Sequence, residues 1–396
     1  MRPVRPVAVL GGVRIPFCRQ NTAYADVGNL GMSVRTLGAL VEKFGLHGQQ
    51  LGEVAMGAVI KHSSDWNLGR EAALSSGLSP LTPGITLQRA CGTSLDSLIT
   101  VGNKIAVGQI EVGIGGGSDS TSDVPIVYGQ SLRRRLLAAA AAKTPRDKLA
   151  AFKQFHPREL KPDFPGVAEP RSGKSMGEHC EDMAKQWSIA RDSQDEWALA
   201  SHRKLAAAYE RGFFDDLMTP YLGLRRDQNL RPDTSLEKLA ALKPLFGSDT
   251  MTAGNSSALS DGAAVDYVHG GEGLLMAPAY AVPRLLQRNG LTLQDFDFYE
   301  IHEAFASTVL VTLAAWESDA FCRERLGLDE PLGKVDRDRV NVLGSSLAAG
   351  HPFAATGGRI VATLAKLLHE KGSGRGLISI CAAGGQGVVA ILEAAR

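Results

Sequence analysis

The sequence predicts an α/β protein built from two similar halves around an inserted segment. Strand-like apolar runs alternate with segments of helical spacing in the first third and again from about residue 248. Such alternation is typical of a mixed or parallel sheet covered by helices on both faces. A weak internal repeat indicates duplication, because Cys91 and His351 each begin a helical segment that leads to a glycine-rich strand end. Between the halves, residues 122–246 are rich in prolines and basic residues and poor in strand formers.

Individual elements follow from the spacing of apolar residues. Short buried strands are expected in the first half at 7–12, 53–60, 84–90 and 111–117. Helical spacing covers 29–46, where a glycine lies near the end, and 176–214, with a turn near 188–194. In the second half, 295–301 and 378–380 are strand-like, and 303–316 is helical.

Composition limits the classes of protein. The chain has 396 residues, 44% of them hydrophobic and 21% charged, which suits two or three globular domains. Forty-three basic residues against 42 acidic ones give no global field that would favour nucleic acid. Five scattered cysteines without a C-x-x-C pair argue against a disulfide framework or a zinc site, and a reducing cytoplasm is expected. The apolar N-terminal run is too short for a secretory signal and no apolar run reaches about 20 residues, so a cytosolic or peripherally attached protein is expected.

A candidate nucleophile stands in the stretch QRACGTSLDS, residues 88–97. Cys91 lies where an expected strand ends and an expected helix begins. A thiolate at a helix N-terminus is stabilised by the dipole and by unpaired N–H groups, which lowers the pKa by about one unit or more. The alternative is a buried thiol that packs as a small hydrophobic side chain.

Three further candidates lie at the ends of elements. His351 stands between glycines and before a proline, and a cysteine nucleophile needs such a base. Cys381 follows the strand-like run ISI, and His302 lies between a strand-like and a helical run. Open α/β sheets bind ligands at strand ends. The alternative for each histidine is a core or surface residue without a catalytic role.

Four motifs resemble those of the thiolase family, and the resemblance covers almost the whole chain. They are QRACGTSLDS around Cys91, IHEAF at 301–305, AAGHPFAATGGR at 348–359 and CAAGGQG at 381–387. The stretches at 252–264 and 176–208 are also similar to thiolase segments.

The resemblance implies two α/β halves that form a five-layer αβαβα body with an inserted helical and loop domain. Residues 1–121 and 247–268 would form the N-terminal half, and 269–396 the C-terminal half. Residues 122–246 would be the inserted domain, expected to bind CoA and to contact a membrane or a partner. After residue 265 the family usually continues with a further strand and helix, whereas this chain passes abruptly to the next helix, as though residues were absent.

The resemblance also implies residue roles. Cys91 would be the acylated nucleophile, His351 its base, and Cys381 the group that moves the proton to and from the enolate carbon or the incoming thiol. His302 occupies the place where most thiolases have asparagine, whose side chain holds a water that binds the thioester oxygen. The backbone N–H groups of Cys91 and Ala383 would form a second oxyanion hole, although the family usually has glycine at position 383.

For coenzyme A, the resemblance implies that Ser257, Met176 and Phe305 line the channel of the pantetheine arm. Each has a structural alternative: a loop hydroxyl, a core methionine and a core aromatic ring. CoA is the expected co-substrate, and no metal or nicotinamide is expected.

His302 and the strings GGGSDS and GHPFAATG are most similar to the thiolase subunit of trifunctional β-oxidation complexes. The implied reaction is CoA-dependent cleavage of 3-ketoacyl-CoA to acetyl-CoA and a shortened acyl-CoA. The alternatives are condensation of two acetyl-CoA to acetoacetyl-CoA and a non-catalytic, thiolase-like lipid-binding protein. A decarboxylating ketoacyl synthase would lack a cysteine at the position of Cys381. A homodimer or tetramer and a hydratase/dehydrogenase partner subunit are expected by analogy.

The basic stretch at 131–155 allows three interpretations. Its arginines lie beside an apolar helical run, which suits an anionic membrane surface or a partner helix. The third interpretation is a solvated face of the insertion.

Overall fold

The computed structural model describes residues 5–245, 247, 249–260 and 274–395. The chain forms two compact units: Met1–Asp123 with Ala168–Arg396 in the larger one, and Val124–Val167 in the smaller one. The division into halves and an inserted domain at residues 122 and 246 stays a prediction. The abrupt passage after residue 265 falls mainly on 261–273, outside the described residues.

In the larger unit, the described residues form a parallel sheet of three strands in the order β2-β1-β3. Its strands are β1 Glu53–Gly57, β2 Gly84–Leu87 and β3 Gly113–Gly117. Helices α1 (Asn29–Lys43) and α2 (Leu68–Ser75) contribute to the same hydrophobic cluster as Val54 and Met56 of β1, and so cover one face. Helix α3 (Thr93–Ala106) packs on the opposite face, where the glycines of β3 lie against Leu98 and Val101.

A second sheet, of three strands within the described part of the chain, has the order β6-β7-β8, with β6 and β7 parallel and β7 and β8 antiparallel. Its strands are β6 Phe298–Ile301, β7 Arg375–Ala382 and β8 Gln386–Glu393. Because side chains alternate along β7, Leu377 packs with helices α9 (Ala277–Asn289) and α10 (Ala306–Glu317), whereas Ile378 packs with α13 (Thr356–Lys371).

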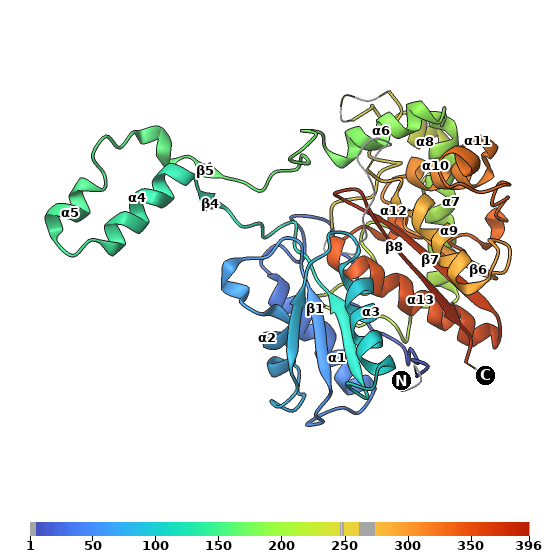
Figure 1. Cartoon of the computed structure of the whole chain (residues 1–396), viewed down its shortest axis with the longest axis horizontal. Helices are drawn as coiled ribbons and strands as arrows, with labels where there is room; N and C mark the ends of the chain where they lie inside the picture. The colour runs from blue at the N-terminus through green and yellow to red at the C-terminus, as the bar shows by residue number, and fades with distance from the viewer. Residues whose placement is uncertain (1–4, 246, 248, 261–273, 396) are drawn as a thin grey trace. The chain divides into compact units, whose positions relative to one another are not determined.

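Helices α3 and α13 form the layer between the two sheets (Figure 1). Leu95 of α3 joins Ile360 and Leu364 of α13 in one hydrophobic cluster. A glycine permits this close approach, since a Cβ on Gly357 would lie 2.7 Å from the backbone nitrogen of Leu95. The layers therefore alternate from helices to sheet, helices, sheet and helices. This order confirms the predicted five-layer αβαβα fold.

Further helices surround the second sheet. They are α6 Met176–Gln186, α7 Arg191–Glu210, α8 Leu236–Ala240, α11 Asp319–Glu324 and α12 Ser346–Ala349. Short 3-10 turns lie between β1 and α2 at Ser63–Asp65, before α12 at Arg337–Arg339 and before α13 at Phe353–Ala355. Helix α6 begins with a capping box, in which the Ser175 and Glu178 side chains each accept a backbone N–H of the other residue. The break between α6 and α7 falls at the predicted turn.

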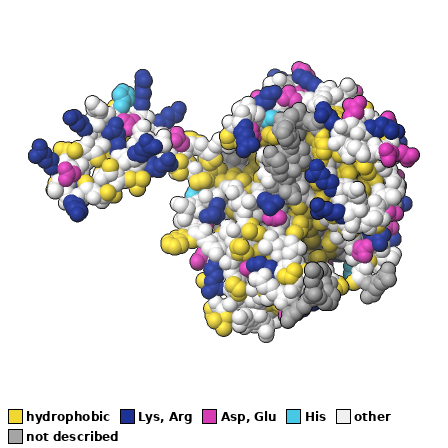
Figure 2. All heavy atoms as spheres, in the orientation of Figure 1, with side chains coloured by type: hydrophobic (Ala, Val, Ile, Leu, Met, Phe, Trp, Pro, Cys, Tyr) yellow, Lys and Arg dark blue, Asp and Glu magenta, His cyan; other side chains and the backbone are white. Residues whose placement is uncertain are grey.

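The smaller unit is a helical hairpin on a short strand pair. It consists of β4 Val127–Tyr128, α4 Gln130–Ala141, α5 Pro145–Ala150, the 3-10 turn Pro157–Leu160 and β5 Pro162–Asp163, which pairs antiparallel with β4. Arg135 ties α4 to the returning chain through Glu159 and three backbone carbonyls. Figure 2 shows basic and apolar side chains together on this unit. Within the described residues, no helix combines the length and apolarity needed to cross a bilayer.

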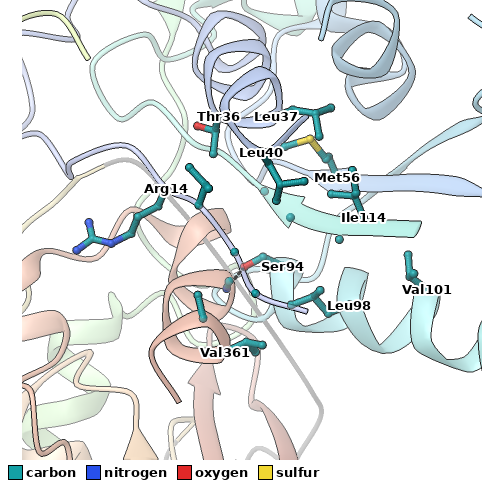
Figure 3. A pocket seen from close by; sticks show the side chains of 18 of the residues that line it. Arg14, Thr36, Leu37, Leu40, Met56, Ser94, Leu98, Val101, Ile114 and Val361 are labelled. Atoms are coloured by element: carbon teal, nitrogen blue, oxygen red, sulfur yellow. Dashed lines mark hydrogen bonds between the residues drawn. The ribbon is translucent and has the colours of Figure 1, made fainter. Parts of the chain in front are cut away.

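The strand predicted at 7–12 is wrong. Residues 5–13 have no strand partner among the residues that the structure describes, and the first β contact there is an isolated bridge between Arg14 and Met218. Val7, Val9 and Leu10 are exposed by 41%, 40% and 75%. The segment and β3 both line a cavity of about 640 Å³, into which α1 and α3 also project apolar side chains (Figure 3). An apolar run becomes a strand only when a neighbouring backbone accepts its ladder of hydrogen bonds, and here the run borders a cavity instead.

Candidate active site

Cys91 lies in a sharp turn between β2 and α3. Strand β2 ends at Leu87 and α3 begins at Thr93, so five residues carry the chain through the turn. Ala90 has a φ of +43°, in the left-handed region that a side chain with a Cβ rarely adopts. The Cys91 side chain is half-buried. A strained backbone therefore fixes the direction in which the thiol leaves the turn.

The described structure brings His351 to Cys91 although 260 residues separate them. The Nε2 atom of His351 lies 3.2 Å from the Cys91 sulfur, and its Nδ1 atom lies 2.9 Å from the Thr356 hydroxyl. His351 is 5% exposed and follows α12, just before α13 begins at Thr356. The imidazole is therefore oriented by one hydrogen bond while its other nitrogen faces the thiol, as a nucleophile and its base require.

The expectation of a lowered Cys91 pKa is not met. Burial raises the pKa of Cys91 to about 12, and the Asp119 charge adds to this. Backbone hydrogen bonds from Ala383 and from Cys91 itself lower the pKa, but they do not outweigh the loss of water. Burial lowers the pKa of His351 to about 3, with the Arg359 charge acting in the same direction. The resting pair is therefore a neutral thiol beside a neutral imidazole.

His302 completes a pair of stacked histidines. It follows the last residue of β6, and its ring centroid lies 4.2 Å from that of His351. The side chain is 1% exposed, its Nδ1 atom lies 2.8 Å from the Ser346 hydroxyl, and its Nε2 atom has no partner among the described residues. Burial and then the charge of His351 lower the pKa of His302 well below the usual value, so the ring is neutral.

Cys381 lies near the end of β7, opposite Gly387 of β8, and is 4% exposed. Burial raises its pKa, and the charge of Cys91 acts in the same direction. The backbone N–H of Ala383, two residues further on, acts to lower the pKa of Cys91. The structure thus gathers Cys91, His302, His351, Cys381 and Ala383 at the ends of elements from both halves.

The three residues expected along the CoA channel lie beside this group. The Ser257 amide and hydroxyl both donate to the Ala304 carbonyl, at 2.9 and 2.7 Å. Met176 and Phe305 are partly buried and pack against the hydrophobic cluster that contains Cys381. Met176 and Phe305 therefore share a hydrophobic cluster with the second thiol, and Ser257 is bonded to Ala304 of the same cluster.

Sequence reasoning missed three polar residues behind the histidines. Ser346 bonds His302, Arg359 on α13 bonds Ser346, and Glu300 stands on β6 two residues before His302. Glu300 is an acidic residue in an otherwise apolar strand, and Arg359 closes the AAGHPFAATGGR motif, so both left a signal in the sequence. Ser346 left none, because a serine at the start of a short helix is common and gives no sign of a contact with His302.

Within the part of the chain that the structure describes, no group of three or more His, Cys, Asp or Glu residues is arranged to hold a metal ion. All five cysteines are free thiols. The groups that the described site offers are thiols, imidazoles and backbone N–H donors.

A duplicated α/β body that presents a thiol and an imidazole at strand ends from its two halves defines a cysteine-dependent acyltransferase. Comparison with known families gives the particular family. The family model of the thiolase N-terminal domain matches residues 7–268, and that of the thiolase C-terminal domain matches residues 262–394. The chain belongs to the thiolase family.

Individual relatives agree. The chain is 36% identical over 420 aligned positions to a 3-ketoacyl-CoA thiolase of Yersinia pestis (strain Pestoides F), with 98% of this chain and 96% of the relative covered. The same values hold for the 3-ketoacyl-CoA thiolase of Yersinia pseudotuberculosis serotype O:1b (strain IP 31758). Among solved structures, the crystal structure of the Bacillus anthracis acetyl-CoA acetyltransferase matches with a TM-score of 0.83 and 27% identity, over the full length of both chains.

Proposed function

We propose that this thiolase cleaves 3-ketoacyl-CoA with coenzyme A to give acetyl-CoA and a shortened acyl-CoA, by way of an acyl-cysteine. The single observation that carries the proposal is the contact of 3.2 Å between the Cys91 sulfur and His351 Nε2. A thiol and its base at that distance can exchange a proton as the sulfur attacks. Both groups are neutral at rest, so the reactive thiolate forms when substrate binds.

The proposed reaction has two halves. In the first, His351 takes the proton of Cys91, the sulfur bonds to the keto carbon, and the bond between C2 and C3 breaks. The electron pair leaves on C2 as the enolate of acetyl-CoA, which takes the proton of Cys381. In the second half, Cys381 removes the proton of an incoming CoA thiol. The CoA sulfur then attacks the acyl-cysteine, and Cys91 leaves as a thiolate that regains a proton from His351.

Two sets of donors suit the negative charge that develops in these steps. The Nε2 atom of His302, beside His351, lacks a protein partner among the described residues and suits the enolate oxygen. The backbone N–H groups of Cys91 and Ala383, which both act to lower the pKa of the Cys91 thiol, suit the oxyanion of the acyl-enzyme. Removing one preorganised donor of this kind costs about 10²- to 10³-fold in turnover in other enzymes.

Degradation of longer substrates is preferred over acetyl-CoA condensation for one reason. The chain is more similar to relatives named 3-ketoacyl-CoA thiolase, at 36% identity, than to the acetyl-CoA acetyltransferase structure, at 27%. A series of specific activities over 3-ketoacyl-CoA substrates from about four to sixteen carbons tests the choice. We expect activity to extend to the longer substrates. Activity confined to acetoacetyl-CoA would favour the condensing role.

The CoA contacts of Met176, Phe305 and Ser257 are part of the proposal. Met176→Ala should raise KM for CoA and leave kcat within about 2-fold, because a contact with the arm is uniform binding. Leu326→Ala is the matched control, since Leu326 packs on the same hydrophobic cluster as Met176 and has no proposed CoA contact. Equal KM values for Met176→Ala and wild type would remove Met176 from the channel.

We also propose a cytoplasmic homodimer or tetramer that can join a hydratase/dehydrogenase subunit. Size-exclusion chromatography with light scattering tests the first part, and a monomer at micromolar concentration would contradict it. Co-purification with a tagged hydratase/dehydrogenase from the same organism tests the second.

The smaller unit is proposed to make the peripheral membrane contact. Arg133 and Arg134 are exposed on α4, whereas Arg135 holds the unit together through Glu159. The informative variant is therefore Arg133→Ala with Arg134→Ala, leaving Arg135 in place. Co-sedimentation with anionic vesicles should fall in this variant, and unchanged binding would contradict membrane contact.

A further inference from the structure

Arg359 is a buried cation with no ion-pair partner among the described residues. It is 5% exposed, and its Nη2 atom donates to the hydroxyls of Ser345 and Ser346, at 2.9 and 3.2 Å. A buried guanidinium without a direct carboxylate partner is costly, so its place in the core requires a compensating role. Ser346 connects Arg359 to the site, because its hydroxyl also contacts His302.

The contacts of Ser346 determine the direction of a short hydrogen-bond chain. A guanidinium can only donate, so the Ser346 oxygen is an acceptor toward Arg359. The hydroxyl proton is then free for His302 Nδ1, which lies 2.8 Å away. If His302 carried its proton on Nδ1 instead, the Ser346 oxygen would accept twice and its own buried proton would have no acceptor among the described residues.

We infer that Arg359, acting through the Ser346 hydroxyl, fixes His302 as the tautomer that carries its proton on Nε2. This inference rests on the proposed function for its catalytic consequence, but the tautomer itself is a property of the resting protein. The Nε2–H group has no protein partner among the described residues, and the centroid of its ring lies 4.2 Å from that of His351. It is therefore a donor available to the substrate oxygen. Arg359 and Ser346 are positioning residues, since neither touches Cys91.

The electrostatics support the same arrangement. Arg359 lowers the pKa of His302, after burial and His351, and so keeps the ring neutral. A neutral ring has one N–H group, and only the hydrogen-bond partner of the other nitrogen decides which atom carries it. The positive charge behind Ser346 also makes its hydroxyl a stronger donor.

The chain offers a matched control in the next residue. Ser345 accepts a hydrogen bond from the same Arg359 atom and does not contact His302. Ser346→Ala should lower kcat about 10-fold and leave KM within about 2-fold of wild type. The loss is smaller than on removal of a whole oxyanion donor, because His302 remains and only its tautomer is no longer fixed. Ser345→Ala should keep kcat within about 2-fold of wild type. Equal losses in both variants would overturn the inference, because a merely structural role would not separate them.

A double-mutant cycle ties the effect to His302. In a His302→Ala background, adding Ser346→Ala should cost no further turnover. A full additional loss in that background would show that Ser346 acts elsewhere.

The tautomer can be read without any activity. In protein labelled with ¹⁵N-histidine, two-bond ¹H–¹⁵N spectra show which ring nitrogen of each neutral histidine carries the proton, and His302→Asn assigns the signals. We expect Nε2–H in wild type and in Ser345→Ala, and a mixture in Ser346→Ala and Arg359→Met. A wild-type proton on Nδ1, or no change in Ser346→Ala, would overturn the inference even if the proposed reaction holds. An Nε2–H tautomer in a protein without thiolase activity would instead overturn only the proposed function.

Discussion

Cys91 and His302 both lie just beyond strands in the larger unit, one in each sheet, and the chain holds them in different ways. Cys91 is oriented by backbone, through a tight turn and a left-handed Ala90. His302 is oriented by side chains, through Ser346 and Arg359. The orientation of the Cys91 nucleophile therefore depends on local backbone geometry. The orientation of the His302 imidazole depends on hydrogen bonds that connect the end of β6 to α12 and α13.

The largest effect should come from removing the base. His351→Ala should lower kcat by about 10²- to 10⁴-fold, because the buried thiol of Cys91 then has no neighbour to take its proton. Steady-state kinetics measures the loss. The variant should also lose the pH dependence that His351 sets. Retention of more than about a tenth of the activity would show that another group deprotonates Cys91.

Cys381 differs from both Cys91 and His302, because it lies near the end of β7 and packs in a hydrophobic cluster. Cys381→Ala should keep the acylation of Cys91 by acyl-CoA and lose formation of the carbon–carbon bond, by about 10²-fold or more. Intact-mass spectrometry follows acylation, and absorbance of the 3-keto thioester follows condensation. Equal loss of both steps would mean that its role is misassigned.

Close to this side-chain network in sequence, the buried carboxyl group of Glu300 should make the stability of the fold depend on pH. Glu300 is fully buried with both carboxylate oxygens unpaired among the described residues, and burial raises its pKa to about 8, while the Arg359 charge lowers it. Because the folded state holds this proton more tightly than the unfolded chain does, Glu300 makes stability fall as pH rises from about 4.5 to 8.

Glu300→Gln should remove that dependence, which is at most about 1.4 kcal/mol per pH unit for one proton. Urea unfolding at pH 5 and pH 8 measures the free energy of unfolding in both proteins. Glu317→Gln is the matched control, because Glu317 is exposed at the end of α10. If wild type and Glu300→Gln lose stability in parallel with rising pH, Glu300 is ionised in the folded protein.

The smallest effect concerns the backbone of the nucleophile turn. Ala90→Gly should change the free energy of unfolding by less than about 1 kcal/mol, because relief of strain at a φ of +43° offsets the extra freedom of glycine in the unfolded chain. Ala90→Val should destabilise by about 1–2 kcal/mol, since a β-branched residue tolerates this φ least. Thermal unfolding compares the two. Equal stability of both variants would mean that the turn can relax and does not fix Cys91.

The same contrast explains how much the sequence could predict. Strands β1, β2 and β3 could be predicted from short buried runs and helices α1 and α3 from helical spacing, because each of these elements packs against its neighbours in the fold. The run at 7–12 has the composition of a strand but borders a cavity. Local composition does not determine whether a neighbouring strand is available for backbone hydrogen bonds. The candidates Cys91 and His351 could be selected by their place between elements.

The pKa values could not be read from the sequence. The helix N-terminus and the N–H groups at Cys91 favour the thiolate, but burial outweighs them, and burial is a property of the packed fold. Ser346 and Arg359 were missed for a similar reason. Their importance depends on which hydroxyl lies between a guanidinium and an imidazole in space, and the spacing of 13 residues between them gives no sign of it.

The central claim is that Cys91 accepts the acyl group with help from His351. Wild type and Cys91→Ser should be mixed with a 3-ketoacyl-CoA without free CoA, quenched, and examined by intact mass and peptide mapping. The account predicts one acyl group on the peptide of Cys91 in wild type, released by added CoA, and none in Cys91→Ser. An acyl group on Cys381 or on any other residue in wild type, or undiminished acylation of Cys91→Ser, would contradict it.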